Sequence, residues 1–180
     1  QGTGLYDAII VGAFFYGVVY SQWLGGRRGL HRAVRGFAAR FAAVLGAAAV
    51  DPQIGALPLI LALVLILWTP PHFWSLAIAN EADYAAAGVP MLPVVVGPQR
   101  AAHIVLGNTV ALVAASLLPA FFGAGPIYVI GAALGGAHFV HKAWRLSRAP
   151  SRKTAMGSFF ASLVQLSLVL AGATIDGLLR

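Results

Sequence analysis

Cysteine is absent from this chain of 180 residues, and charged side chains are few. The absence of cysteine excludes disulfide bonds, cysteine-ligated zinc and thiol catalysis. Asp, Glu, Lys and Arg make up 9% of the residues, whereas soluble domains carry about a quarter. Hydrophobic residues make up 59%. This composition argues against a water-soluble domain and predicts a polytopic membrane protein surrounded by a lipid bilayer.

Acidic residues are scarcer than basic ones, with 5 Asp and Glu against 12 Lys and Arg, for a net charge of +7. In a soluble protein this excess would suggest a nucleic-acid partner. In a membrane protein it is better explained by cationic loops that are held on one side of the bilayer. We therefore expect no nucleic-acid partner.

Long apolar runs predict a single all-α domain with about six transmembrane helices, since each spanning helix needs about 20 apolar residues. The uncharged stretch 101–141 is too long for one helix and divides at a Gly-Pro turn near 122–126. Pro70-Pro71 should kink or stop the third helix. The predicted helices cover approximately residues 6–24, 31–50, 54–78, 101–121, 127–144 and 154–175.

The basic residues gather in alternate loops of this six-helix arrangement. Loops 25–35, 79–100 and 142–153 hold all 12 of them except Arg40 and Arg180. By the positive-inside rule, these loops face the cytoplasm and both termini of the chain face the opposite side. We expect a multi-pass protein of the bacterial cytoplasmic (inner) membrane, with periplasmic termini.

A segment rich in aromatic residues, from Trp68 to Trp74, lies at the cytoplasmic end of the third predicted helix. Aromatic rings at this depth are typical of an interfacial belt. His72 within it follows Pro70-Pro71, which free backbone carbonyls beside it. An imidazole in this position could ligate a metal or haem, or donate a hydrogen bond to a phosphate.

Two carboxylates, Glu81 and Asp83, are the only acids on the predicted cytoplasmic side, and Tyr84 follows them. Carboxylates on a basic, membrane-facing surface suggest Mg²⁺ coordination with a diphosphate as the other ligand; the alternative is a solvated loop. Arg27 and Arg28 could hold an anionic substrate through charge-assisted hydrogen bonds. For this basic loop considered alone, a topology signal in contact with lipid headgroups is the better explanation.

Three further features have both a structural and a functional interpretation. Arg40, inside a short predicted helix, is either functional or extends its charge to the interface. His138 and His141, spaced i,i+3 on one helix face, are candidate haem ligands or interfacial histidines. Gly131-x-x-x-Gly135 would allow close helix approach.

Several stretches resemble one known family. WTPPHFWSLAI from Trp68, then DYAAAGVPMLPVV from Asp83, resemble the haem O synthase (protoheme IX farnesyltransferase) family of the UbiA prenyltransferase superfamily. YGVVYSQWLGGRR upstream, and SLLP and FFASLVQLSLVL downstream, also fit. The resemblance implies a nine-helix fold, of which these six helices are the last six. It also implies two Asp-rich cytoplasmic loops that bind Mg²⁺ and farnesyl diphosphate and promote loss of diphosphate. A haem vinyl group then captures the allylic cation.

The resemblance assigns roles by position and also shows departures from the family pattern. Asp83 and Tyr84 match the end of the second Asp-rich motif, His72 matches the family's histidine, and Arg27-Arg28 match its basic loop. The family has two adjacent aspartates before the tyrosine, whereas this chain has Ala82-Asp83, with Glu81 as the nearest other carboxylate. The first Asp-rich motif belongs to a region that this sequence does not contain.

Three functional hypotheses follow. Ionising an allylic diphosphate requires neutralisation of about three negative charges, largely by Mg²⁺ bound to two complete Asp-rich motifs. Asp83 with a displaced Glu81 is a poor substitute for these motifs. The leading hypothesis is therefore a catalytically degenerate relative, a pseudoenzyme that acts as an accessory subunit of a respiratory, haem–copper oxidase-type membrane complex or takes part in its biogenesis. The first alternative is an active protoheme IX farnesyltransferase represented by a fragment, since the chain begins at Gln1. The second is a haem-binding membrane module that uses His72, His138 or His141.

Overall fold

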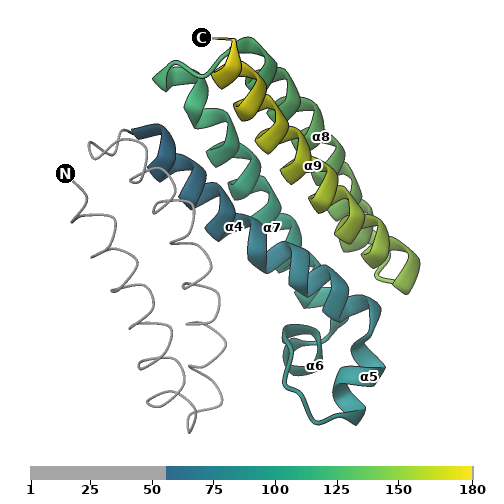
Figure 1. Cartoon of the computed structure of the whole chain (residues 1–180). Helices are drawn as coiled ribbons and strands as arrows, with labels where there is room; N and C mark the ends of the chain where they lie inside the picture. The colour runs from purple at the N-terminus through teal and green to yellow at the C-terminus, as the bar shows by residue number, and fades with distance from the viewer. Residues whose placement is uncertain (1–55, 180) are drawn as a thin grey trace, which may run out of the picture. The chain divides into compact units, whose positions relative to one another are not determined.

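The computed structural model describes residues 56–179, and every regular element in that range is helical. The elements are α4 (Ala56–Ala79), α5 (Glu81–Ala86), α6 (Leu92–Val96), α7 (Pro98–Leu117), the 3-10 helix η2 (Leu118–Phe122), α8 (Pro126–Arg148) and α9 (Arg152–Leu178) (Figure 1). The helices predicted over 6–24 and 31–50 lie outside the described residues, as do Arg27, Arg28 and Arg40.

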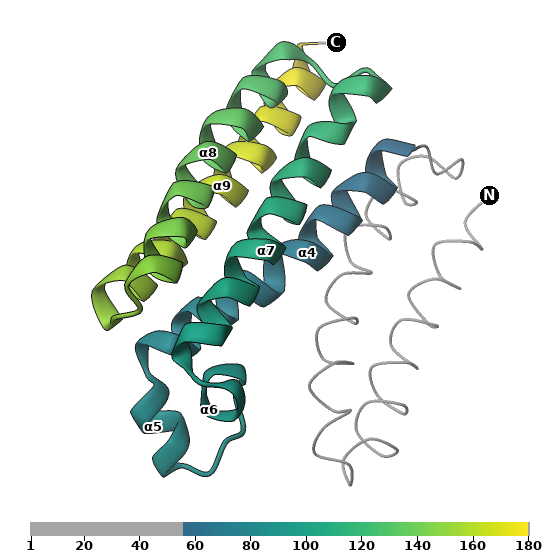
Figure 2. The same cartoon turned by 180° about the vertical axis from the view of Figure 1, so that it is seen from behind.

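The chain divides into two compact units, 1–66 and 67–180, with the boundary inside α4. The contacts below all belong to the second unit. Within it α8 packs against both α7 and α9, and the two views of the chain agree on this arrangement (Figure 2). Hydrogen bonds join α4 to α7 and to α9, so α4 completes a group of four helices.

Three segments of the described part are long and apolar enough to cross a membrane: Leu59–Ala79, Pro98–Phe122 and Arg152–Leu178. With its 23 residues, α8 is about 35 Å long, which also exceeds the roughly 30 Å of a bilayer core. It is less apolar than the other three, because histidines and basic residues occupy its second half. The chain is thus an all-α polytopic membrane protein, and the number of six spans remains a prediction.

The proline pair does not stop α4, contrary to one of the two expected outcomes. Pro70 and Pro71 lie inside a helix that continues to Ala79. Proline has no N–H, so Pro71 leaves the carbonyl four residues earlier, that of Leu67, without its helical donor. Asn108 on α7 supplies a replacement, because its Nδ2 donates to the Leu67 carbonyl at 2.7 Å. A neighbouring helix can thus satisfy a backbone group that a proline frees.

Glycines on α8 and α9 allow these two helices to approach closely, as the Gly131-x-x-x-Gly135 spacing predicts. A Cβ added at Gly131 would lie 3.0 Å from the Leu168 carbonyl oxygen, and one at Gly135 would lie 3.0 Å from Gln165 Cα. These separations are tighter than most real Cβ contacts. Side chains at either position would push α9 away.

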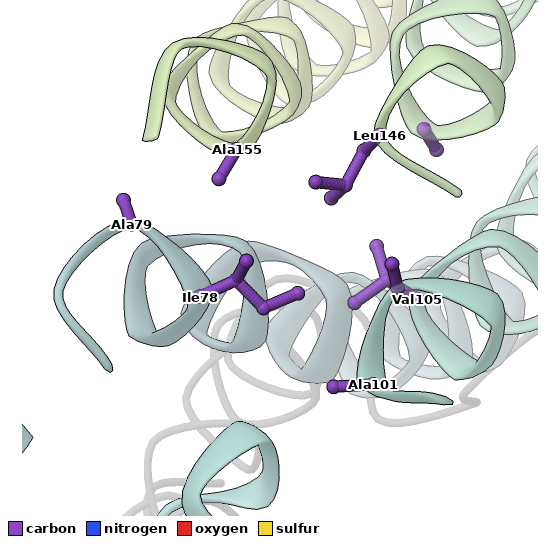
Figure 3. Close-up of a cluster of buried hydrophobic side chains, with 8 residues drawn as sticks. Ile78, Ala79, Ala101, Val105, Leu146 and Ala155 are labelled. Atoms are coloured by element: carbon purple, nitrogen blue, oxygen red, sulfur yellow. The ribbon is translucent and has the colours of Figure 1, made fainter. Parts of the chain in front are cut away.

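The four long helices meet at one end of the unit in an apolar cluster (Figure 3). Its members are Ile78, Ala79, Ala101, Ala102, Val105, Ala143, Leu146 and Ala155. They come from the end of α4, the start of α7, the end of α8 and the start of α9, so loop 80–97 and turn 149–151 lie at this same end. These two segments belong to the predicted loops 79–100 and 142–153, whose side of the membrane stays a prediction.

The opposite end is held by hydrogen bonds from one tyrosine. The hydroxyl of Tyr128 on α8 donates to the Ser116 carbonyl at 2.9 Å, and its backbone N–H donates to Asp176 Oδ2 at 2.8 Å. Asp176 is buried on α9. A carboxylate beside the first turn of α8 is stabilised there by the unpaired N–H groups and the helix dipole.

Candidate functional site

The predicted carboxylates lie on α5, which follows α4 almost directly. Asn80 lies between the two helices, and its Nδ2 donates to the Leu76 carbonyl at 3.0 Å, within the last turn of α4. Glu81 and Asp83 occupy the first turn of α5, where their negative charges are favourable. Asp83 is exposed and Glu81 is half-buried. Neither side chain forms a hydrogen bond or ion pair with another residue of the 56–179 range.

Glu81 and Asp83 do not form a carboxylate pair, because residues two apart on a helix do not face each other. Across residues 56–179, no three His, Cys, Asp or Glu side chains gather into a metal site. Mg²⁺ typically takes only one or two protein carboxylates and fills its other positions with water and substrate phosphates. An exposed Asp83 whose side chain has no partner within the described range therefore fits a Mg²⁺–diphosphate ligand set. Tyr84, the third predicted residue of this loop, is half-buried on the same helix.

His72 is held on α4 between two aromatic rings. The Trp68 ring stacks on it at a centroid distance of 4.2 Å, and the Phe159 ring of α9 stacks at 4.4 Å. Its Nδ1 lies 2.8 Å from the Ser162 hydroxyl oxygen. Only 9% of the residue is exposed. The structure therefore fixes both the plane of this imidazole and one of its two nitrogens.

His72 is one of several buried polar residues on α4 and α9: His72, Ser75, Ser158, Ser162 and Gln165. The Ser75 and Ser158 hydroxyl oxygens are 3.0 Å apart. Gln165 is fully buried, and both its amide atoms lack a partner in the described part of the chain. Such groups are normally satisfied by internal water or by a polar ligand atom.

The other two candidate haem ligands lie elsewhere. His138 and His141 are exposed on α8, and the His141 ring lies 6.3 Å from the ring of Trp144. Arg148 adds its guanidinium 5.9 Å from the same indole. Their i,i+3 spacing places both histidines on one exposed face, whereas His72 is buried against α9. The structure does not bring the three histidines together.

Asn108, Ser162 and Gln165 are not among the residues that the sequence indicated. A signal for two of them was present, because Ser158, Ser162 and Gln165 recur at i, i+4 and i+7 in the predicted last helix. Polar residues on one stripe of a membrane helix indicate the face that packs against other helices. Asn108 stands alone on α7 and gives no such pattern.

Comparison with known proteins extends this description beyond the described residues. The UbiA prenyltransferase family matches residues 8–164. The chain is 54% identical over 171 residues to protoheme IX farnesyltransferase 2 of Paramagnetospirillum magneticum, covering 95% of this chain and 59% of that relative. It is 47% identical over 169 residues to protoheme IX farnesyltransferase 1 of the same organism, covering 93% and 60%.

A third relative, protoheme IX farnesyltransferase of Azoarcus sp., is 43% identical over 166 residues, covering 92% of this chain and 56% of the relative. The chain thus spans somewhat more than half the length of these relatives. No solved structure matches it significantly. Because the family match covers most of the sequence and agrees with the all-helical fold, the chain belongs to the UbiA prenyltransferase family.

Proposed function

We propose that this chain takes part in farnesyl transfer to haem, with haem and farnesyl diphosphate as substrates and Mg²⁺ as the cofactor. Three relatives between 43% and 54% identical are named protoheme IX farnesyltransferase. The observation that carries the proposal is Asp83, which is exposed at the end of the bundle where loop 80–97 lies and whose side chain has no partner among residues 56–179. A carboxylate left free in this way is suited to a metal-bound phosphate.

In this proposal the residues divide into a diphosphate site and a haem site. Asp83 binds Mg²⁺, with Glu81 and Tyr84 nearby on α5, and Arg27 and Arg28 contact phosphate oxygens. When bound, Mg²⁺ supplies the positive charge that stabilises the departing diphosphate. His72 lies seven residues before the end of α4 at Ala79, about 10 Å along the helix axis, so it serves a different part of the site from the carboxylates of α5. We assign it to the haem.

A second candidate function is a catalytically degenerate subunit of a respiratory membrane complex of the haem–copper oxidase type. It is favoured by Ala82, which stands where the family pattern has an aspartate. The geometry of α5 adds to this argument, because Glu81 and Asp83 do not face one direction and Glu81 cannot replace the missing neighbour. In this case the chain would co-purify with the complex and form no product.

One assay separates the two candidates. Membranes that contain this chain are incubated with haem B, farnesyl diphosphate and Mg²⁺, and haem O is measured by chromatography. Farnesyl transfer predicts haem O, a loss of at least about 100-fold in Asp83→Ala and a smaller loss in Glu81→Ala, since removal of one charged catalytic group commonly costs about 100-fold or more. Absence of haem O together with co-purification of an oxidase would support the accessory function.

A haem-binding module remains a separate proposal that uses His72, or His138 and His141. It predicts a Soret band in the purified protein that shifts when the ligating histidine is replaced. Because His72 is buried between two rings while His138 and His141 are exposed, the His72→Ala variant and the doubly substituted α8 variant distinguish the two possible sites. A colourless protein that takes up no added haem would exclude the module.

The basic residues of the bundle also indicate which of its ends faces the cytoplasm. The basic turn between α8 and α9 and the loop that holds α5 share one end of the bundle, opposite the Tyr128 end. We assign the basic end to the cytoplasm of a bacterial inner membrane, following the positive-inside rule.

A further inference from the structure

The hydrogen bonds around Ser162 determine which nitrogen of His72 carries the proton. The Ser162 hydroxyl oxygen has two close neighbours: the Phe159 carbonyl oxygen at 2.6 Å and His72 Nδ1 at 2.8 Å. A serine hydroxyl has a single hydrogen to donate and can also accept. The question is therefore which of the two neighbours receives that hydrogen.

The carbonyl must receive it. A carbonyl oxygen has no hydrogen, so the 2.6 Å contact between the Phe159 and Ser162 oxygens is attractive only when the hydroxyl hydrogen lies between them. This distance is at the short end of the range for O–H···O hydrogen bonds. Toward His72 the same oxygen can then only accept, and the donor at 2.8 Å is the Nδ1–H of the imidazole.

We infer that Ser162 is a positioning residue that holds neutral His72 with its proton on Nδ1 and an unprotonated lone pair on Nε2. A neutral imidazole has one N–H, so protonation at Nδ1 leaves Nε2 as an acceptor. The stacked rings of Trp68 and Phe159, inclined to the imidazole by 21° and 28°, hold the ring plane. A ring flip within this stack would break the bond to Ser162.

This assignment narrows what His72 can do. A lone pair on Nε2 accepts a proton or coordinates a Lewis-acidic metal centre such as a haem iron. Neutral His72 cannot donate from Nε2 to a diphosphate, which was one of the interpretations open at the sequence level. The tautomer of His72 does not depend on the proposed farnesyl transfer. The choice of haem iron as the partner of Nε2 rests on that proposed function.

The test is ¹⁵N NMR of the chain in lipid, with all histidines labelled and the His72 signals identified by their loss in His72→Gln. We expect the Nδ1–H form to exceed the Nε2–H form by about tenfold or more, as expected for a buried, correctly matched hydrogen bond. In Ser162→Ala the two forms should approach equal populations. Ser162→Thr, which keeps the hydroxyl, should restore the wild-type ratio.

Ser158→Ala is the matched control, because this serine lies one turn earlier on α9 and bonds Ser75 rather than His72. Its His72 spectrum should equal that of the wild type. A wild-type protein with the Nε2–H form in excess would overturn the inference, even if Ser162→Ala does not fold. An unchanged ratio in a folded Ser162→Ala would overturn it as well. If the wild-type chain forms no haem O but shows the expected Nδ1–H signal, the proposed function is contradicted and the tautomer assignment stands.

Discussion

Replacing Gly172 by alanine should separate α8 from α9 at the end of the bundle where Tyr128 lies. A Cβ at this position would lie 2.7 Å from Tyr128 Cα, 3.2 Å from its backbone nitrogen and 3.3 Å from the Ile127 carbonyl oxygen. All three atoms belong to the backbone of α8, so no side-chain rotation relieves the clash. At Gly136, by contrast, the nearest atom is Cγ1 of Val113, whose side chain can adjust.

The size of the effect follows from the distance that has to be opened. Carbon atoms in good contact are about 3.5–4.0 Å apart, so α9 has to move by about 1 Å from the first turn of α8. A gap of about 0.5–1 Å already loses a quarter to a half of the dispersion energy of the atoms concerned. The same shift stretches the 2.8 Å bond from Tyr128 N–H to Asp176. We expect Gly172→Ala to lower the free energy of unfolding by about 1–3 kcal/mol, the range for an overpacked interior.

Thermal unfolding of the purified protein in mild detergent, followed by circular dichroism, measures this effect. Gly177→Ala is the control, since it lies on the same helix and a Cβ there meets nothing within 4 Å. Alanine at that position should be neutral or stabilising by up to about 1 kcal/mol, the difference in helix propensity. If Gly172→Ala unfolds at the same temperature as Gly177→Ala, the close approach of α8 and α9 described above is refuted.

Three further predictions concern polar contacts and orientation. Asn108→Leu should lower the free energy of unfolding by about 1–2 kcal/mol in the same thermal assay, because the substitution removes the hydrogen-bond donor of the Leu67 carbonyl. An unchanged stability would mean that the carbonyl has another partner. Gln165→Leu should raise the free energy of unfolding by about 1–3 kcal/mol, because it removes a buried amide that has no partner among the residues the structure describes. A loss of stability would indicate that the amide binds an internal water or a ligand atom. Ala149 and Ala120 are exposed at opposite ends of the bundle, so a single cysteine can be introduced at each. A membrane-impermeant thiol reagent should reach Ala149→Cys from the cytoplasmic side and Ala120→Cys from the periplasmic side. The reverse pattern would contradict the proposed topology.

Long apolar runs and short helices differ in how far the sequence indicates them. The described long helices are α4 (Ala56–Ala79), α7 (Pro98–Leu117), α8 (Pro126–Arg148) and α9 (Arg152–Leu178), against predicted ranges of 54–78, 101–121, 127–144 and 154–175. The loop predicted over 79–100 contains α5 and α6, of six and five residues. Helices this short show no periodic pattern, and they form through contacts with neighbouring segments rather than by propensity.

The candidate site was only partly accessible from sequence. The Asp83 side chain could be identified, because a carboxylate among basic loops stands out and the family motif includes it. The part of the His72 environment that lies on α9 could not, since its bond to Ser162 joins residues that are 90 positions apart and Phe159 belongs to the same distant helix. Serines in membrane helices commonly bond their own backbone, so their presence does not reveal an interhelical role.

Continuation of α4 through its two prolines affects how the protein is inserted into the membrane. The Leu67 carbonyl receives its hydrogen bond from Asn108, 41 positions later in the chain. At a synthesis rate of about 5–20 residues per second, the ribosome needs roughly 2–8 s to reach Asn108 after Leu67. Throughout this interval the newly inserted α4 carries an unpaired acceptor. Release of α4 into lipid before α7 emerges would expose this group to hydrocarbon, so the two helices should leave the insertion machinery as a pair.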